Sequence, residues 1–389
     1  MKNLLFSASF RNNVVRASAI VLFLAVISVA EAQEERIVPG AERIDQYIQY
    51  TRSHTIAVVA NHTSMVGTAH LVDTLCSLGV DIETIFCPEH GFRGTADAGA
   101  HIDDSVDPKT GIPIISLYGN NTKPTHQQLK DINMVIFDLQ DVGCRFYTYI
   151  STLQYVMEAC AEDSIPLIVL DRPNPNGHYV DGPVMEKKYT SFVGMQEGIP
   201  AVYGMTIGEY ALMLNEEHRL KDSLKCDLRI VKMLNYSHDS ALCRSIVLPV
   251  APSPNLRTPQ AVALYPSLCL FEGTNISVGR QTPYPFEVLG TNLQRTYNDF
   301  SLDKWVDLRN VEVASKFDLQ YLKMMYRKVA KGKFFLKSNF FEKLAGTATL
   351  RKQLMQGASD EVIRASWEPA LCRFKELRKK YLLYPEEGL

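Results

Sequence analysis

The stretch Ile82–Gly94, IETIFCPEHGFRG, carries the pattern that decides the fold. Its apolar run stops at a proline and then opens into glycines, which is typical of a buried strand that ends in a loop. In open α/β sheets, ligands bind outside the carboxyl ends of the strands. Glu89, His90 and Arg93 follow this strand end, where they could supply a proton donor and an anion-binding group. A solvated loop with a helix-capping Glu89 would explain the same residues.

Strand and helix patterns alternate on both sides of this stretch. The predicted strands are Thr55–Ala60, Glu83–Cys87, Ile112–Leu117, Met134–Leu139, Pro166–Leu170 and Asp227–Met233. The predicted helices are His70–Leu78, Thr125–Lys130, Tyr149–Ala161 and Thr206–Leu220. Near-continuous apolar strands that alternate with helices predict an α/β fold with a mostly parallel, Rossmann-like sheet covered on both faces. No G-x-G-x-x-G follows any strand, so the sequence supports neither NAD nor FAD, and we expect no cofactor.

The character of the chain changes after about residue 240. Prolines cluster, a loop rich in turn-forming residues spans Leu270–Arg280, and helical patterns return at Leu319–Ala330 and Asp360–Tyr381. We therefore expect a Rossmann-like domain at 33–240 and a smaller α+β domain at 241–389. Because ligands often bind where two domains meet, we expect the active-site crevice between them.

The first 32 residues have the pattern of a secretory signal peptide. Lys2, Arg11 and Arg16 precede the apolar stretch Ala17–Val29, and an A-x-A cleavage site follows. Removal of this segment, which also contains one glutamate, changes the formal net charge from −2 to −4. A mildly acidic chain has no overall attraction to nucleic acid, and no later segment is long and apolar enough to cross a bilayer. We therefore expect an exported protein, periplasmic or secreted, without an integral membrane segment.

The cysteines and histidines show no metal-binding pattern. All eight cysteines lie after the predicted signal peptide, and none forms a CxxC pair. The histidines are scattered without the spacing of metal ligands, so we expect no metal. Export makes disulfides possible, but the sequence leaves their pairing open.

Polar side chains follow several of the predicted strands. A parallel sheet brings the carboxyl ends of its strands to one edge, so these side chains should converge in one crevice. They are Asn61, Asp138, Gln140, Asp141, Arg145, Tyr147, Asp171, Arg172, Asn174 and Asn176. Glu272 and Arg280, on either side of a glycine-bearing loop in the second predicted domain, could face the same crevice.

Each of these groups has a ligand-binding and a structural interpretation. Arg145 could hold a substrate carboxylate, and Tyr147 could stack on a sugar ring, whereas Asp141 is better explained as a helix cap. Asn174 and Asn176 lie in the proline-rich segment Asp171–Gly177, which suits either recognition of hydroxyl and acetamido groups or a rigid turn.

Six motifs in order give the chain a specific resemblance. They are Asn61–Ser64 (NHTS), Phe86–Gly91 (FCPEHG), Asp138–Gly143 (DLQDVG), Asp171–Gly177 (DRPNPNG), Phe271–Thr274 (FEGT) and Ser277–Arg280 (SVGR). From about Ile56 to Pro385 the chain resembles the exo-β-N-acetylmuramidase family NamZ. The resemblance implies a two-domain enzyme that releases N-acetylmuramic acid from the non-reducing end of peptidoglycan fragments, with its catalytic glutamate at Glu89. The chain departs from the family pattern at His62, Gln281 and Ala348, where the family usually has glutamine, glycine and aspartate.

With this substrate, the residues suggest a mechanism. Glycosidic cleavage needs an acid that protonates the leaving oxygen, and our hypothesis is that Glu89 is this general acid. His90 could hydrogen-bond the substrate or orient Glu89. Muramic acid carries a lactyl carboxylate. Arg145 is the first candidate for the arginine that binds this group, and Arg280 is the second. The second catalytic group could be Asp138, Asp171, Glu272 or the acetamido group of the substrate.

Two other classes of protein remain possible from the sequence. An exported, non-catalytic protein could hold muropeptides between two domains. A metal-dependent deacetylase or esterase would need a cluster of metal ligands, which the sequence does not show.

Overall fold

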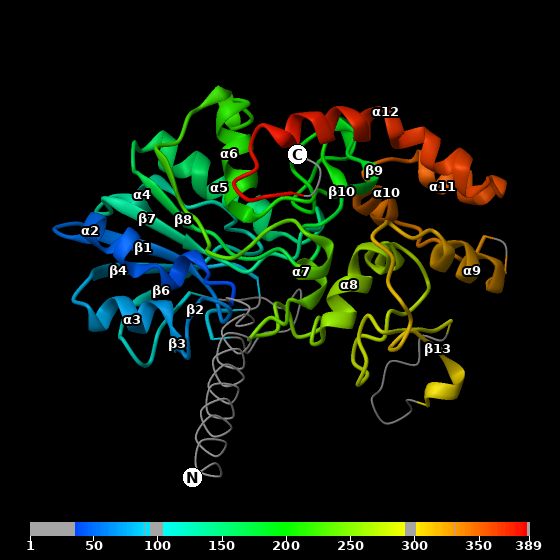
Figure 1. The fold of residues 1–389 in the computed structure, drawn as a ribbon, viewed down its shortest axis with the longest axis horizontal. Coiled ribbons are helices and arrows are strands. Elements are labelled where there is room, and N and C mark those ends of the chain that lie inside the picture. The colour runs from blue at the N-terminus through cyan, green and yellow to red at the C-terminus, as the bar shows by residue number, and fades with distance from the viewer. Residues whose placement is uncertain (1–35, 90, 94–103, 292–300, 331, 387–389) are drawn as a thin grey trace, which may run out of the picture. The chain divides into compact units, whose positions relative to one another are not determined.

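A seven-stranded sheet organises the first half of the chain in the computed structural model, which describes residues 36–89, 91–93, 104–291, 301–330 and 332–386 (Figure 1). Its strands are β1 (Thr55–Ala60), β4 (Asp81–Cys87), β5 (Ser105–Val106), β6 (Pro113–Ser116), β7 (Met134–Asp138), β8 (Leu167–Leu170) and β11 (Leu228–Val231). They lie in the order β11-β8-β7-β1-β4-β6-β5, and only β5, at one edge, runs antiparallel to its neighbour. The six parallel strands have the doubly wound order of a Rossmann fold, which confirms the predicted fold class.

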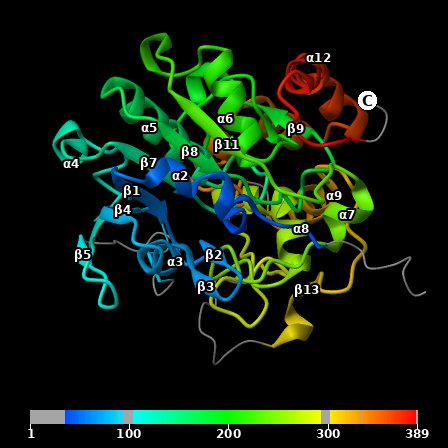
Figure 2. The ribbon, with the colours of Figure 1, turned by 60° about the vertical axis from the view of Figure 1, so that its left-hand side comes forward.

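The two faces of the sheet are covered by different helices. α3 (Leu71–Ser77) lies on one side, and α5 (Tyr149–Glu162) and α6 (Ile207–Glu216) lie on the other (Figures 1 and 2). Side chains of β1 alternate between the faces: Ile56 and Val58 join the apolar cluster that contains Leu75 of α3, and Val59 joins the cluster that contains Leu153 of α5. Both faces are therefore buried, as the nearly continuous apolar strands predict.

The remaining elements are short strand pairs, further helices and 3₁₀ turns. Three antiparallel pairs join β2 (Met65–Val66) with β3 (Ala69–His70), β9 (Asp181–Val184) with β10 (Pro200–Val202), and β12 (Val288–Leu289) with β13 (Val306–Asp307). The other α-helices are α2 (Ile48–Thr51), α4 (His126–Leu129), α7 (Ser240–Ser245), α8 (Pro259–Leu268), α9 (Gln320–Lys328), α10 (Phe340–Ala345), α11 (Thr349–Gln356) and α12 (Asp360–Lys379). Short 3₁₀ turns are η1 (Gly40–Glu42), η2 (Ile44–Gln46), η3 (Lys187–Tyr189), η4 (Lys221–Ser223), η5 (Cys269–Gly273) and η7 (Leu302–Lys304).

α8 shows why the proline-rich region was hard to interpret from the sequence. Thr258 caps the helix by accepting a hydrogen bond from the Ala261 N–H, and Pro259 occupies the first helical position, where its missing N–H costs nothing. Pro266 lies inside the helix. The prolines that suggested irregular structure therefore belong partly to a buried helix.

One apolar core joins the first and second halves of the chain. The cluster that contains Leu153 of α5 continues through Leu264 of α8, Leu322 of α9 and Trp367 of α12. Residues Val38–Leu389 accordingly form one compact unit. All eight cysteines are free thiols, and within the described ranges no helix has the length and apolar character to span a bilayer. The predicted signal peptide, residues 1–32, lies outside the described residues.

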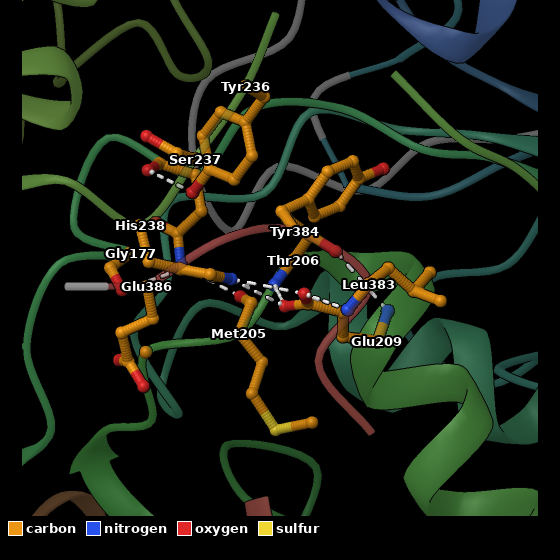
Figure 3. A network of polar contacts seen from close by, with 12 residues as sticks. Gly177, Met205, Thr206, Glu209, Tyr236, Ser237, His238, Leu383, Tyr384 and Glu386 are labelled. Atoms are coloured by element: carbon orange, nitrogen blue, oxygen red, sulfur yellow. Dashed lines mark hydrogen bonds and ion pairs between the residues drawn. The ribbon is translucent and has the colours of Figure 1, made fainter. Parts of the chain in front are cut away.

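The C-terminal segment returns to the first half of the chain. α12 packs along β9, and the Nε of Arg378 near its end donates to the Gly204 carbonyl at 2.7 Å. Beyond it, the Leu383 N–H donates to Glu209 Oε1 at 2.7 Å (Figure 3). The Tyr384 hydroxyl donates to Asp171 Oδ2 at 2.6 Å. These bonds fasten the last described residues to α6 and to the end of β8.

A buried imidazole and carboxylate form the centre of this contact. His238 Nε2 lies 3.0 Å from both oxygens of Glu209, and neither side chain is exposed to solvent (Figure 3). His238 Nδ1 lies 2.9 Å from the Gly177 carbonyl, which can only accept a hydrogen bond, so Nδ1 donates. His238 thus bonds a different neighbour through each ring nitrogen. Removal of His238 or Glu209 would leave the other side chain buried without its hydrogen-bond partner.

We expect Glu209→Gln to lower the free energy of unfolding by about 3 kcal/mol, because the amide leaves the buried His238 without a carboxylate. Urea unfolding at neutral pH measures this loss. The matched control is Glu216→Gln at the other end of α6, whose exposed side chain pairs with Lys225 at 3.1 Å. The control should change stability by less than about 0.5 kcal/mol. Equally small losses in both variants would contradict the importance of the buried pair.

Asp171 predicts a dependence of stability on pH. Burial raises the pKa of its carboxyl to about 6. Because the unfolded carboxyl titrates near pH 4, folding binds a proton between about pH 4 and about pH 6, and this contribution to stability is lost as the pH rises through that window. Asp171→Asn removes this linkage. Relative to wild type, the variant should gain about 2 kcal/mol between about pH 4.5 and about pH 7 in urea unfolding. The exposed Asp131→Asn serves as control, and an equal variant-to-wild-type difference at both pH values would contradict the linkage.

Candidate active site

A cavity of about 410 Å³ lies where the end of β4 meets the start of α5 and the C-terminal part of the chain. Glu89 follows β4, Tyr147 lies just before α5, Glu272 belongs to η5, and Arg280 lies in the loop after it. The structure therefore brings four of the predicted site residues to one enclosed space. The cavity contains side chains from both predicted domains.

Hydroxyl groups surround Glu89. Thr148 Oγ1 lies 3.3 Å from Glu89 Oε2, and the Tyr149 hydroxyl lies 3.5 Å from the Glu89 main-chain carbonyl. Tyr118, after β6, also contacts Glu89: burial, followed by the charge and hydrogen bond of Glu89, raises the pKa of the Tyr118 hydroxyl to about 12. Because a hydroxyl can donate or accept, such neighbours can bond a carboxyl group in either protonation state. Glu89 itself is half-buried on the cavity wall.

Glu272 and Arg280 form an ion pair on the cavity wall. Arg280 Nε donates to Glu272 Oε1 at 2.8 Å, and Arg280 Nη2 donates to the same oxygen. Within the described part of the chain, Arg280 Nη1 and Glu272 Oε2 make no hydrogen bond. The guanidinium also lies over the ring of Phe286, at 5.3 Å from its centroid. Glu272 thus orients Arg280 and leaves part of the guanidinium able to bind an anion.

Aromatic rings make up much of the remaining wall. They belong to Phe146, Tyr147, Phe192, Tyr265, Phe286 and Phe340. Tyr265 contacts Phe146 and Phe286 edge to face, with centroid distances of 5.4 Å and 5.1 Å. The Tyr147 hydroxyl donates to the Pro252 carbonyl at 2.5 Å, which leaves its ring as the part that lines the cavity. Such rings can pack against the apolar face of a sugar.

The predicted convergence of strand ends is correct, but most of the side chains bind one another. Arg172 pairs with Asp138 through Nε at 2.5 Å and Nη2 at 2.8 Å, and both side chains are buried. Asn61 Nδ2 donates to the Tyr149 hydroxyl at 2.6 Å, and Gln140 Nε2 donates to the Pro173 carbonyl at 2.7 Å. These bonds fill the crevice between β1 and β7. This corrects the expectation that these residues line an open crevice.

Arg145 also occupies a different position from the one expected. It has no exposed surface, and its Nη1 donates to the carbonyls of Pro183 and Ile199 at 2.9 Å and 2.7 Å. Its Nη2 donates to the Leu344 carbonyl at 2.8 Å, and burial lowers the pKa of its guanidinium to about 9. Its contacts therefore tie three chain segments together. This position argues against Arg145 as a reader of a substrate carboxylate.

Other predicted site residues are bound to the protein itself and do not line the cavity. They are Asp141, Asp171, Asn174 and Asn176. Asp141 accepts hydrogen bonds from the Tyr203 hydroxyl and the Gly143 N–H, and burial raises the pKa of its carboxyl to about 6. The two asparagines bond main-chain carbonyls, as in the rigid-turn interpretation of this segment. Their amides are thereby occupied by protein carbonyls.

Arg93, near Glu89 in the sequence, does not line the cavity. Arg93 pairs with Asp107 at 2.7 Å and with Asp73 at 3.2 Å, away from the cavity lining. His90 lies outside the described residues. Among the residues that are described, no group of three or more His, Cys, Asp or Glu side chains could hold a metal ion.

Tyr118, at a predicted strand end, lines the cavity as the convergence of strand ends suggests, whereas sequence reasoning did not select Thr148, Phe192 and Phe340, which also line it. Thr148 lies between two tyrosines of the strand-to-helix turn, so its position alone could have suggested it. Phe192 and Phe340 gave no such signal. Only the tertiary fold brings these two distant rings to the cavity.

Two departures from the family pattern have a structural correlate. Gln281 has a φ of 65°, in the left-handed region where glycine is least strained. Ala348 is the N-cap of α11 and offers no side-chain cap, whereas an aspartate there could accept a hydrogen bond from the first turn. Neither residue lines the cavity with Glu89.

Comparisons with known proteins agree over nearly the whole described chain. The family description "Exo-beta-N-acetylmuramidase NamZ, N-terminal" matches residues 56–260, and the corresponding C-terminal description matches residues 263–302 and 303–384. The chain is 39% identical over 337 residues to "Peptidoglycan beta-N-acetylmuramidase NamZ" of Bacillus subtilis (strain 168), covering 78% of this chain and 80% of that protein.

Two crystal structures from Bacteroides fragilis NCTC 9343, both described as DUF1343 family proteins, share the fold. The first has a TM-score of 0.80 and 40% identity and covers 91% of this chain and 100% of its own. The second has a TM-score of 0.76 and 28% identity and covers 90% of this chain and 99% of its own. The ordered motifs, the Rossmann-like sheet and these matches together show that the chain belongs to the exo-β-N-acetylmuramidase NamZ family.

Proposed function

We propose that this protein is an exo-β-N-acetylmuramidase that releases N-acetylmuramic acid from the non-reducing end of peptidoglycan fragments, with Glu89 as the general acid. Membership of the NamZ family supports muramidase activity. The observation that carries the assignment is the position of Glu89 on the wall of an aromatic-lined cavity that also contains an arginine. Such a cavity offers a proton donor, a surface for a sugar ring and a group that binds an anion.

Glu89 has the position that a general acid requires. It lies at the carboxyl end of a central strand, where ligands bind in open α/β sheets. Hydroxyl groups bond it without removing it from the cavity. In the proposed reaction, the protonated Glu89 gives its proton to the glycosidic oxygen as the bond to the sugar breaks.

Arg280 is a better candidate than Arg145 for the residue that binds the lactyl carboxylate. Muramic acid differs from glucosamine by this group, so an arginine that binds it would distinguish the two sugars. Arg145 is enclosed by main-chain carbonyls, whereas Arg280 lines the cavity and its side chain is 37% exposed. The ion pair with Glu272 holds the guanidinium in place before substrate binds, which reduces the entropic cost of binding.

The structure also separates the three candidates for the second catalytic carboxylate. Asp138 is paired with Arg172, and Asp171 accepts hydrogen bonds from Thr206 and Tyr384. Neither lines the cavity, whereas Glu272 does. This difference supports Glu272, among the three, as the carboxylate that would act on a bound sugar.

Export of the protein is consistent with a substrate derived from peptidoglycan. The signal-peptide pattern of residues 1–32 would deliver the enzyme to the periplasm or the cell exterior, where peptidoglycan fragments occur. We therefore include an exported location in the proposal.

Glu89→Gln tests the general acid. The variant keeps the shape of the side chain but cannot supply the proton, so we expect kcat on a chromogenic β-N-acetylmuramide to fall about 1,000-fold. Glu83→Gln, an exposed position on the same strand, should retain wild-type activity. A folded Glu89→Gln enzyme with full release of N-acetylmuramic acid would contradict the assignment. Wild-type protein that binds a muropeptide disaccharide but releases no monosaccharide would instead support a non-catalytic binder.

Arg280→Met tests recognition of the lactyl group. We expect kcat/KM for the muramide to fall about 30-fold and that for the matching glucosaminide to change much less, because only the muramide loses a charge-assisted hydrogen bond. Arg309→Met is the control, since Arg309 pairs with Asp307 outside the cavity lining. An unchanged ratio of the two kcat/KM values would exclude Arg280 as the reader.

A further inference from the structure

The hydroxyl of Thr148 is not used in the way its position in the helix predicts. Thr148 is the N-cap of α5, where a threonine side chain typically accepts a hydrogen bond from an N–H of the first turn. Thr206 does this at α6 and Thr125 does this at α4. At α5 there is no such bond, and Thr148 Oγ1 instead lies 3.3 Å from Glu89 Oε2. Thr148 has helical main-chain angles, whereas Thr125 and Thr206 have the extended angles of a capping residue, so the Thr148 hydroxyl meets Glu89 and not the first turn of its helix.

The residue that follows Thr148 holds the main chain of Glu89. The Tyr149 hydroxyl donates to the Glu89 carbonyl at 3.5 Å and accepts a hydrogen bond from Asn61 Nδ2 at 2.6 Å. Asn61 in turn accepts hydrogen bonds from the N–H and the hydroxyl of Thr63 through Oδ1, at 2.9 Å and 2.6 Å. The end of β1 and the start of α5 therefore constrain the backbone of Glu89, while Thr148 constrains its carboxyl group.

We propose that Thr148 is a positioning residue for the proton-donating carboxyl of Glu89, a role that rests on the proposed function. A carboxyl group is planar, so contact at Oε2 together with a fixed backbone also sets the direction of the other oxygen. A proton donor must be directed at the glycosidic oxygen, and small errors in such geometry reduce rates strongly. Asn61 was expected from the sequence to bind substrate. It instead bonds the Tyr149 hydroxyl, which in turn bonds the main chain of Glu89.

The contact of Thr148 with a carboxyl group also gives the proposal a test in the pH profile. A hydroxyl that donates to an ionised carboxylate stabilises that form, and the positive end of the α5 dipole acts in the same direction. Among the described residues, Tyr118, Tyr147 and Tyr149 interact electrostatically with Glu89, and Glu272 and Arg280 line the same cavity. Burial raises the pKa values of Tyr118, Tyr147 and Tyr149, so these hydroxyls stay neutral in the working range of a glycosidase.

The test measures kcat and KM against pH for Thr148→Ala and Thr148→Ser with the chromogenic muramide. For Thr148→Ala we expect kcat to fall about tenfold, with KM within about twofold, because the lost contact orients the acid without binding the sugar. The alkaline limb of the rate profile should move up by about half a pH unit, since the protonated carboxyl persists when its donor is lost. Thr148→Ser keeps the hydroxyl and should restore both values.

Stability and a matched control separate positioning from a structural role. Because Thr148 makes no cap, Thr148→Ala should leave the melting temperature within about 2 °C of wild type. Thr152→Ala is the control: its hydroxyl lies one turn further along α5 and bonds the Thr148 carbonyl at 3.4 Å. This control should not move the alkaline limb.

Each outcome decides between the two proposals. Suppose that wild type is active, that Glu89→Gln is inactive, and that the alkaline limb of the pH–rate profile is the same in Thr148→Ala as in wild type. This result would overturn the role of Thr148 and leave the proposed function standing. The role of Thr148 would also be overturned if Thr148→Ala shifted the alkaline limb and Thr148→Ser showed the same shift. Wild-type protein that releases no sugar, or a fully active Glu89→Gln, would overturn the proposed function and with it this inference.

Discussion

The buried ion pair between Asp138 and Arg172 is the interaction on which the arrangement of the sheet edge depends. Burial of two charges is costly, and two hydrogen bonds at 2.5 Å and 2.8 Å offset that cost. Arg172 also donates to the Met65 carbonyl, and the Asp138 carbonyl accepts a bond from the Ser64 hydroxyl. The pair thus joins the loops that follow β1, β7 and β8. It closes the crevice between β1 and β7, where a Rossmann fold usually binds its ligand.

The side chains at the ends of β1 and β7 fill that crevice. The cavity lies instead at the end of β4, the strand next to β1. The start of α5 supplies one side of it, and the chain after residue 250 supplies much of the rest. The apolar core explains why this wall can be rigid, since the cluster under α5 continues through α8, α9 and α12. The buried contacts of Glu209, Asp171 and Tyr384 hold the C-terminal segment against the same half of the chain. The arrangement of residues around this cavity therefore depends on bonds between residues far apart in sequence.

Much of the fold could be predicted from the sequence because its causes are local. Apolar runs that end at proline, glycine or polar residues specified the strands, and α3, α5, α6, α9 and α12 lie within a few residues of their predicted ranges. α8 was missed because its prolines resemble those of a loop. α10 and α11 were missed because they are short, at six and eight residues, and offer few turns in which a period can be detected.

The sequence by itself determined the family and the parallel sheet, since each depends on ordered local motifs, and it singled out Glu89 as the candidate acid that we propose. Tertiary structure alone decided which polar residues meet the cavity. Arg145 and Arg280 carry the same chemistry, yet carbonyls from three distant segments enclose Arg145, while Glu272 holds Arg280 on the cavity wall. The hydroxyl of Thr148 similarly acquires its partner only when β4 and α5 pack together. A motif specifies which groups are present, but burial and long-range contacts determine which of them remain free to act.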